Sequence, residues 1–370
     1  MYLTDDQSKF LVCIFCGIAR TPEQNAAQRA ETLLNRMEDY YSQTNDAEIR
    51  PNKFSYNAVL TAWARNKDRR TSAENSLRLL KQMWKLFHMH GNVRKDIKPD
   101  ARSYNTVINA VARSGFPNCA DRAYKLLVEM EELYHAGHDE LIPNASTFGA
   151  IINAYANSGQ EESSDQAAKL LQQMNSLYHL GHDDLKPNTF VYNSCINAFA
   201  KNGQNQKEAE KTSEEIMAKR INNICAAEQI LQSMESQFEK TGDEYVKPDV
   251  ISYSTVINAY ANSGDGMAGS KADVLLEKMV QRYVGGDFKV KPNAVTYTSV
   301  IKAWSSVGGT QSTKRMEALL QQMVMLYRAG DQSLKPTSVS FDLVIEGFKD
   351  SGDKNGVKRV ENTRVAMHRK

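Results

Sequence analysis

The sequence is poor in cysteine and proline and has no long apolar run. Five cysteines in 370 residues are few and odd in number, which argues against a disulfide framework and makes a reducing compartment the default. No stretch approaches the ~18 consecutive apolar residues that a membrane-spanning helix needs. The 9 prolines and 20 glycines also exclude a collagen-like or linker-rich chain.

Neither sign of charge dominates. The chain has 46 basic and 44 acidic side chains and a formal net charge of +2, which is a weak indication of a polyanionic partner. Charged residues are 24% and hydrophobic residues 41%, a balance that predicts a buried core. The acidic residues 1–6 resemble neither a signal peptide nor a transit peptide. We therefore expect a cytosolic or nuclear protein, or a natural N-terminus that lies upstream.

A short phrase recurs along the chain. It begins with Pro, which Asn or Asp follows in most copies. Two further residues come next, then a position that is usually Ser or Thr, and finally an aromatic residue. Its prolines are Pro51, Pro99, Pro143, Pro187, Pro248, Pro292 and Pro336. The spacings between them are 48, 44, 44, 61, 44 and 44 residues. A dominant period of this length predicts a repeat architecture.

Each repeat is predicted to be a pair of helices. The Asp or Asn after Pro is a favourable N-cap. Tyr104, Val107 and Ile108 then follow helical spacing, and Gly115 suits a left-handed C-cap. The second helix carries a Leu-Leu-x-x-Met stripe, as in residues 126–130. Because one pair cannot cover its own apolar faces, the pairs must stack into an all-α solenoid of antiparallel helix pairs.

The repeat boundaries follow from the prolines. Residues 1–52 are expected to form an N-terminal partial repeat and 338–370 a C-terminal partial repeat with a basic tail. Six complete repeats lie between them, at 53–100, 101–144, 145–188, 189–249, 250–293 and 294–337. The fourth carries an insertion near 204–220.

The repeat resembles the pentatricopeptide repeat. The resemblance is carried by the Tyr-Asn-x-x-Ile-x-Ala start, closest in 103–110, by the Leu-Leu-x-x-Met centre, and by the Lys-Pro-Asp/Asn boundary, closest in 97–100. It covers nearly the whole chain and implies a right-handed superhelix that binds single-stranded RNA at one base per repeat. The 44-residue period is longer than the family's. The additional residues fall between the two helices and after the Met.

The resemblance assigns base reading to two residues per repeat, one after the aromatic residue and one after the terminal Pro. The pairs are Asn57 with Asp100, Asn105 with Asn144, Gly149 with Asn188, Asn193 with Asp249, Ser254 with Asn293, and Thr298 with Thr337. By the family's correspondence they imply a site U-Y-n-U-A, with the RNA 5′ end at the N-terminal repeats. The Asp or Asn after Pro can also serve as an N-cap. For the Asn after the aromatic, a poor helix former, we favour binding over a role as a satisfied surface group.

The resemblance also implies that residues two positions before the aromatic sandwich the bases. Apolar residues hold this place at Phe54, Phe190, Ile251, Val295 and Val339. Arg102 could stack through its guanidinium plane, whereas Ser146 could not, so the repeat 145–188 is the expected silent position. The lysines before Pro either contact phosphate or are solvated loop residues. They are Lys98, Lys186, Lys247, Lys291 and Lys335.

The candidate catalytic motifs in the sequence do not match the patterns of known catalytic sites. Cys13 and Cys16 form a Cys-x-x-Cys, and His138 with Glu140 a His-x-Glu, but their order is the reverse of that in the zinc deaminases. The 33 residues after the last Pro-Thr are too few for a nuclease domain. No Gly-rich phosphate loop or nucleophile elbow occurs. We predict a protein that is not an enzyme and has no cofactor or metal.

The leading hypothesis is a monomeric, sequence-selective single-stranded RNA-binding protein with no membrane association. The resemblance implies RNA processing, stability or translation in a mitochondrion or plastid, with the cytoplasm as the alternative location. Two other functions stay open. One is a helical scaffold that binds a protein, and the other is an RNA-targeting subunit that recruits a separate enzyme.

Overall fold

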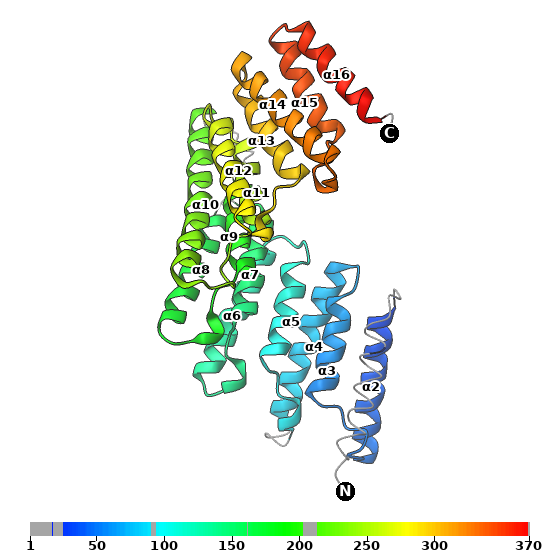
Figure 1. Ribbon diagram of the computed structural model, residues 1–370. Helices are drawn as coiled ribbons and strands as arrows, with labels where there is room; N and C mark the ends of the chain where they lie inside the picture. The colour runs from blue at the N-terminus through cyan, green and yellow to red at the C-terminus, as the bar shows by residue number, and fades with distance from the viewer. Residues whose placement is uncertain (1–16, 18–24, 90–93, 161, 203–212, 369–370) are drawn as a thin grey trace. The chain divides into compact units, whose positions relative to one another are not determined.

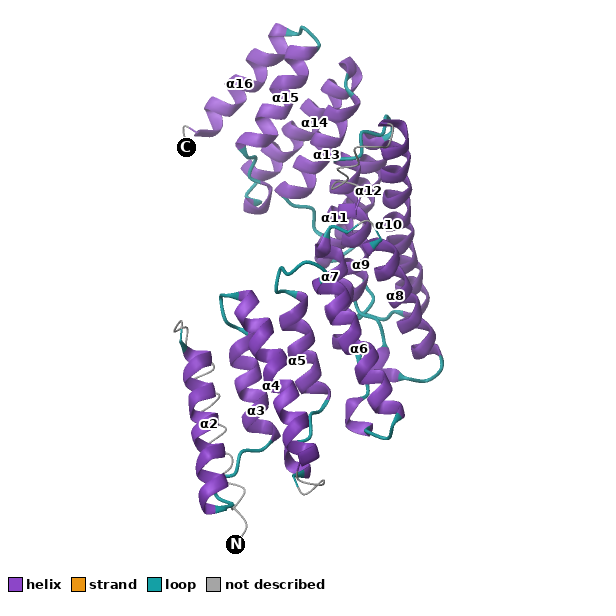
Figure 2. Cartoon of the chain, turned by 180° about the vertical axis from the view of Figure 1, so that it is seen from behind, coloured by secondary structure: helices purple, strands orange, loops and turns teal. Residues whose placement is uncertain are grey.

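The computed structural model describes residues 17, 25–89, 94–160, 162–202 and 213–368. Every regular element in this part of the chain is a helix and none is a strand (Figure 2), which confirms the all-α prediction. None of the described helices combines the length and apolar character needed to cross a membrane. Cys13, Cys16 and residues 204–212 of the predicted insertion lie outside the described residues.

The chain forms two compact units. The first contains Met1–Ser158 and Gln173–Lys186, and the second contains Gly159–Gln172 and Pro187–Lys370. The helix α8 (Ser163–His179) contributes residues to both units.

In the first unit, successive helices run alongside one another, as Figures 1 and 2 both show for α2 to α5. The first helix α3 contacts its own second helix α4 and the first helix α5 of the next pair, and α5 in turn contacts α6 and α7. The elements are α2 (Ala26–Thr44), α3 (Lys53–Ala64), α4 (Arg69–Met89), η1 (Lys95–Ile97), α5 (Ala101–Ala112), α6 (Cys119–His135), η2 (Asp139–Leu141), α7 (Ala145–Ser158) and η3 (Asp183–Leu185).

The second unit repeats this pattern, with α13 in contact with α14 and α15. The elements are α9 (Thr189–Asn202), α10 (Ser213–Thr241), α11 (Val250–Ala261), α12 (Ala268–Val284), η4 (Phe288–Val290), α13 (Ala294–Val307), α14 (Gly309–Arg328), η5 (Gln332–Leu334), α15 (Ser338–Asp350) and α16 (Lys354–His368). At 29 residues, α10 is longer than the 17 of α12. Residues 213–220 of the predicted insertion form its first turns.

The first helix of each pair starts where the sequence places an N-cap. The side chain of Asp100 accepts the backbone N–H of Ser103 at 3.0 Å, and that of Asp249 accepts the N–H of Ser252 at 3.0 Å. These bonds satisfy N–H groups that have no partner within the helix. The helix α5 ends at Ala112 with Arg113 as its C-cap, so the predicted cap glycine Gly115 lies two residues further on, where it adopts the left-handed conformation (φ +70°).

The aromatic residue of the phrase lies in the core. Tyr104 is fully buried, and its hydroxyl donates to the Glu129 carboxylate on α6 at 2.8 Å. Burial, together with this carboxylate, raises the pKa of Tyr104. Leu127 and Met130 of the second-helix stripe are also buried. The hydrogen bond from the hydroxyl of the buried Tyr104 to Glu129 therefore fixes the position of α5 against α6.

The residues beyond the second-helix Met form a second layer of core. After Met130, α6 continues to His135 and is followed by the short helix η2, whose Leu141 is fully buried. The lysine before Pro pairs with an acid in the corresponding turn of the next repeat. Lys98 lies 2.7 Å from Glu140, and Lys291 lies 2.7 Å from Asp331. Lys98 and Lys291 are therefore each paired with a carboxylate.

The packing of α12 on α13 can be tested by substituting a glycine in α12. A Cβ added at Gly269 would lie 2.4 Å from the Trp304 ring of α13. We expect Gly269→Ala to lower the free energy of unfolding by about 1–2 kcal/mol, because overpacking outweighs the better helix propensity of Ala. Urea unfolding measures the change. Gly266→Ala, which meets nothing within 4 Å, is the matched control, and equal stability of the two variants would contradict the packing.

Candidate nucleic-acid interface

The first predicted reading pair is in direct contact. The Asn57 amide nitrogen donates to Asp100 Oδ1 at 3.3 Å, and the Ser103 hydroxyl donates to Asn57 Oδ1 at 2.7 Å. Asn57 is 5% exposed. The start of α3 is therefore joined by polar side chains to the start of α5 in the next repeat.

The same arrangement occurs one repeat later. The Asn105 amide nitrogen donates to Asn144 Oδ1 at 3.3 Å, and the Thr147 hydroxyl donates to Asn105 Oδ1 at 2.6 Å. Asn144 in turn caps α7 by accepting the backbone N–H of Ser146 at 3.0 Å. Asn105 is half-buried.

In the second unit the arrangement links α9 to α11. The Asn193 amide nitrogen donates to Asp249 Oδ1 at 3.1 Å, and the Ser252 hydroxyl donates to Asn193 Oδ1 at 2.7 Å. Asn193 and Asp249 are 56 residues apart, yet they make the same contact as the pairs in shorter repeats. The arrangement therefore follows from the register of the stacked helices and not from the length of the repeat.

Where the reading residue is Ser or Thr, two hydroxyls meet instead. Ser254 Oγ lies 2.9 Å from Thr296 Oγ1, and Thr298 Oγ1 lies 3.1 Å from Ser340 Oγ. Thr296 Oγ1 also donates to Asn293 Oδ1 at 3.2 Å. Ser254 is thus connected to its predicted partner Asn293 through a third residue.

The silent repeat differs at each of these places. Gly149 has no side chain, and its predicted partner Asn188 caps α9 by accepting the N–H of Val191 at 3.1 Å. Val191 stands where the other first helices carry Ser or Thr. Gly149 and Asn188 belong to different units.

These contacts correct one step of the sequence argument. For the Asn after the aromatic, binding was favoured over a role as a satisfied surface group, and Asn57, Asn105 and Asn193 each form a hydrogen bond to the next repeat. The hydroxyls of Ser103, Thr147 and Ser252 were not predicted as part of the site. Their signal was present, because a Ser or Thr three residues after an Asp or Asn is the spacing of a reciprocal cap.

The predicted stacking positions are exposed. Each is the second residue of a first helix, beside the cap. Phe54 is 55%, Phe190 56%, Ile251 58%, Val295 67% and Val339 54% exposed. Arg102 and Ser146, at the same position, are exposed as well. An exposed apolar side chain is ordinary by itself, but its recurrence next to each polar pair makes these residues a regular part of the surface.

The face continues along each first helix, four and eight residues after the reading residue. These positions hold Thr61 and Arg65, Asn109 and Arg113, Asn153 and Asn157, Asn197 and Lys201, Asn258 and Asn262, Lys302 and Ser306, and Glu346 and Asp350. In the first helices α3, α5, α7, α9, α11 and α13, none of the three positions, the reading residue and the residues four and eight places after it, carries an acid. In α15 all three are exposed acids, Asp342, Glu346 and Asp350, and Asp342 pairs with Arg364 at 2.7 Å.

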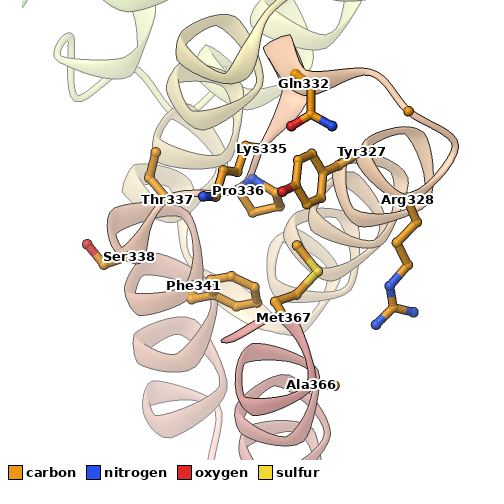
Figure 3. Close-up of a pocket in the computed structure, with 11 residues that line it drawn as sticks. Tyr327, Arg328, Gln332, Lys335, Pro336, Thr337, Ser338, Phe341, Ala366 and Met367 are labelled. Atoms are coloured by element: carbon orange, nitrogen blue, oxygen red, sulfur yellow. The ribbon is translucent and has the colours of Figure 1, made fainter. Parts of the chain in front are cut away.

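A hollow of about 530 Å³ lies beside the N-terminus of α15 in the second unit. Figure 3 shows Tyr327, Phe341 and Met367 around it, with Thr337 at its edge. Thr337 is the last predicted reading residue, and its side chain accepts the N–H of Ser340 at 3.3 Å. The hollow is thus continuous with the capped start of a first helix.

The His-x-Glu residues have structural contacts instead of a shared site. The His138 ring packs against Trp84 with centroids 5.5 Å apart, and Glu140 bonds to Lys98. Burial lowers the pKa of His138. Among the described residues no cluster of His, Cys, Asp and Glu could hold a metal ion.

Comparison with known families identifies the repeat. The pentatricopeptide repeat domain matches residues 89–158 and 236–306, and the single PPR repeat matches residues 190–208. The chain therefore contains pentatricopeptide repeats at these residues.

One similar solved structure is the crystal structure of the pentatricopeptide repeat protein PPR10 from maize. It shares 16% sequence identity with this chain, and the match covers 93% of this chain and 65% of that one, with a TM-score of 0.23. This chain therefore spans just under two thirds of that chain's length. No curated protein sequence matches it.

The contribution of the hydrogen bonds between repeats to the free energy of unfolding can be measured. Asn193→Ala removes both hydrogen bonds between α9 and the start of α11, and we expect a loss of about 1 kcal/mol in the free energy of unfolding. Asn197→Ala, one turn further along α9, removes no hydrogen bond to any residue that the structure describes. This control should be neutral or slightly stabilising. Equal effects in urea unfolding would show that the Asn193 contacts do not contribute.

Proposed function

We propose that the protein binds single-stranded RNA in a sequence-selective manner, reading bases with the polar pairs at the starts of its first helices. The observation that carries the proposal is the recurrence of a polar pair, Asn105 with Asn144 for example, beside an exposed stacking position. Bases recognised singly need hydrogen bonds to their edges and a surface on which to stack. Each complete repeat except 145–188 supplies both.

The hydrogen bonds already made decide what each pair has left for a base. In the Asn193–Asp249 pair, Asn193 Oδ1 receives the Ser252 hydroxyl, and one amide hydrogen points to Asp249. The second amide hydrogen remains as a donor, and Asp249 Oδ2 remains as an acceptor. Uracil presents a carbonyl acceptor beside its N3–H donor, which supports U at this repeat. The Asn57–Asp100 pair makes the same two hydrogen bonds, and there Asp100 Oδ2 also lies 3.6 Å from Lys53 Nζ.

The Asn105–Asn144 pair has a different remainder. Asn144 Oδ1 is used by the cap and by Asn105, so its amide nitrogen is left to donate. Two donors side by side suit the adjacent N3 and O2 acceptors of cytosine. The geometry therefore supports C within the broader expectation of a pyrimidine.

The fifth repeat has more room. Ser254 is shorter than Asn and is held by Thr296 at 2.9 Å. Asn293 Oδ1 caps α13, accepting the N–H of Val295 at 3.0 Å, and its amide nitrogen is left to donate. A small reading residue with a nearby donor supports a purine, in agreement with A from the family's correspondence.

Stacking would provide much of the affinity. Stacking of a base on an aromatic side chain contributes about 1–3 kcal/mol, so Phe54 and Phe190 are the strongest proposed stacking residues. Arg65, Arg113 and Lys302 lie further along the same helix faces, where their charges suit phosphates.

Pentatricopeptide repeat proteins are commonly organellar. We propose that this protein acts in a mitochondrion or plastid, where occupation of an RNA segment would affect its processing, stability or translation. A protein partner or a recruited enzyme would act through the same RNA-bound complex. We expect no chemical step from this chain itself.

Selection from a random single-stranded RNA pool at about 150 mM salt tests the proposal. We expect enrichment of U-Y-n-U-A, and Asn193→Ala should weaken binding about five- to tenfold through the loss of one or two base hydrogen bonds. The loss should depend on the fourth base alone. Retention without a motif would indicate backbone binding only, and no retention would favour a protein-binding scaffold.

The acidic face of α15 gives a second expectation, that the RNA track ends before this helix. Phosphates are repelled by like charges, so nuclease protection should cover about six nucleotides, one per complete repeat. Neutralising Asp342, Glu346 and Asp350 as Asn, Gln and Asn should tighten binding of RNA extended at its 3′ side by about three- to tenfold at low salt.

The matched control neutralises three exposed acids on second helices, Glu74, Glu132 and Asp165. It should leave the preference for extended RNA unchanged. A wild-type footprint that continues past the sixth nucleotide would show that α15 does not end the track.

A further inference from the structure

The hydroxyl on the third residue of each first helix except α9 occupies a place that base reading depends on. We propose that Ser103, Thr147 and Ser252 are positioning residues that decide which edge of the preceding repeat's Asn faces the RNA base. The inference rests on the proposed function and deepens it, because it assigns part of the selectivity to a residue that touches no base.

The geometry is nearly constant. The hydroxyl-to-Oδ1 distances are 2.7 Å for Ser103 to Asn57, 2.6 Å for Thr147 to Asn105 and 2.7 Å for Ser252 to Asn193. Each hydroxyl oxygen also accepts the backbone N–H of its own N-cap residue, as Ser252 does from Asp249 at 3.0 Å. Ser252 is fully buried, which holds its hydroxyl on the Asn side chain.

Elementary donor and acceptor chemistry sets the direction. Backbone N–H groups can only donate, so the cap atom Asp249 Oδ1 that receives them must be an acceptor. The Asn193 group facing that oxygen must therefore be its NH2, and the group facing the Ser252 hydroxyl must be its oxygen. The cap and the hydroxyl together hold the amide in one of its two orientations.

The consequence is selective. With its oxygen turned toward the Ser252 hydroxyl, Asn193 turns its N–H toward the base, which suits the carbonyl of uracil and not the amino group of cytosine. Without the hydroxyl, Oδ1 becomes free to accept, and the amide is held from one side only. A base that presents an amino group would then be tolerated.

The sequence carries an independent sign of this role. A Ser or Thr occupies the third position of α5, α7, α11, α13 and α15, each of which follows a repeat whose reading residue is Asn, Ser or Thr. In α9 the residue is Val191, and the preceding reading residue is Gly149, which has no side chain to orient. The hydroxyl is absent where it would have nothing to hold.

The test compares the full-length wild type with Ser252→Ala and Ser252→Thr, on RNAs that differ only in the base read by Asn193. We expect Ser252→Ala to reduce the preference for U over C about three- to tenfold, which corresponds to the loss of one hydrogen bond. Ser252→Thr should keep the preference, since Thr147 makes the same contact in another repeat. Thermal unfolding checks that each variant is folded.

Thr296→Ala is the matched control. It removes the same cap-box hydroxyl from α13, where the preceding reading residue is Ser254 and has no amide to orient. It should leave the U over C preference at the Asn193 base unchanged. Equal weakening by Ser252→Ala for all four bases, or an unchanged U over C ratio, would overturn the inference. Failure of the wild type to bind any RNA would instead reject the proposed function.

Discussion

The structure depends on one side-chain oxygen per repeat, that of the Asp or Asn after Pro. Asp249 Oδ1 accepts the first free backbone N–H groups of α11 and, at 3.1 Å, the amide of Asn193 in the preceding repeat. The same atom therefore starts a helix and fixes its register against the previous pair. Because these N–H groups have no other partner in the helix, the side chain cannot turn away without a loss of stability.

This constraint links function to folding. In a repeat protein each unit contacts only its neighbours, so stability is a sum of repeat and interface contributions. The proposed reading residues lie within those interfaces, and the buried ones are already hydrogen-bonded. Asn57, at 5% exposure, has little freedom to adapt to a base. Such a site is preorganised, and the entropy lost on binding is correspondingly small.

The sequence predicted much of this arrangement. The 44-residue period located the helix pairs, and the cap, aromatic and glycine positions followed from local chemistry. The hydroxyl of Ser252 and the pairing of Lys98 with Glu140 did not follow, because these contacts join residues 42 to 59 positions apart. Such contacts depend on how far one helix pair is displaced along the next. That displacement is set by packing, including the short helices such as η2, and periodicity alone does not contain it.

The charge distribution bears on how RNA selectivity would arise. The net charge is only +2, and several basic residues are consumed by pairing, Lys291 with Asp331 among them. For a single strand, the logarithm of affinity falls with the logarithm of salt at a slope of about −0.7 per phosphate contact, so few contacts mean weak non-specific binding. The proposed interaction would then rest on stacking and on base hydrogen bonds. Such a protein discriminates between bases through the orientation of its hydrogen-bonding amides. Because non-specific electrostatic binding is weak, an amide that points the wrong way lowers the affinity by its full contribution.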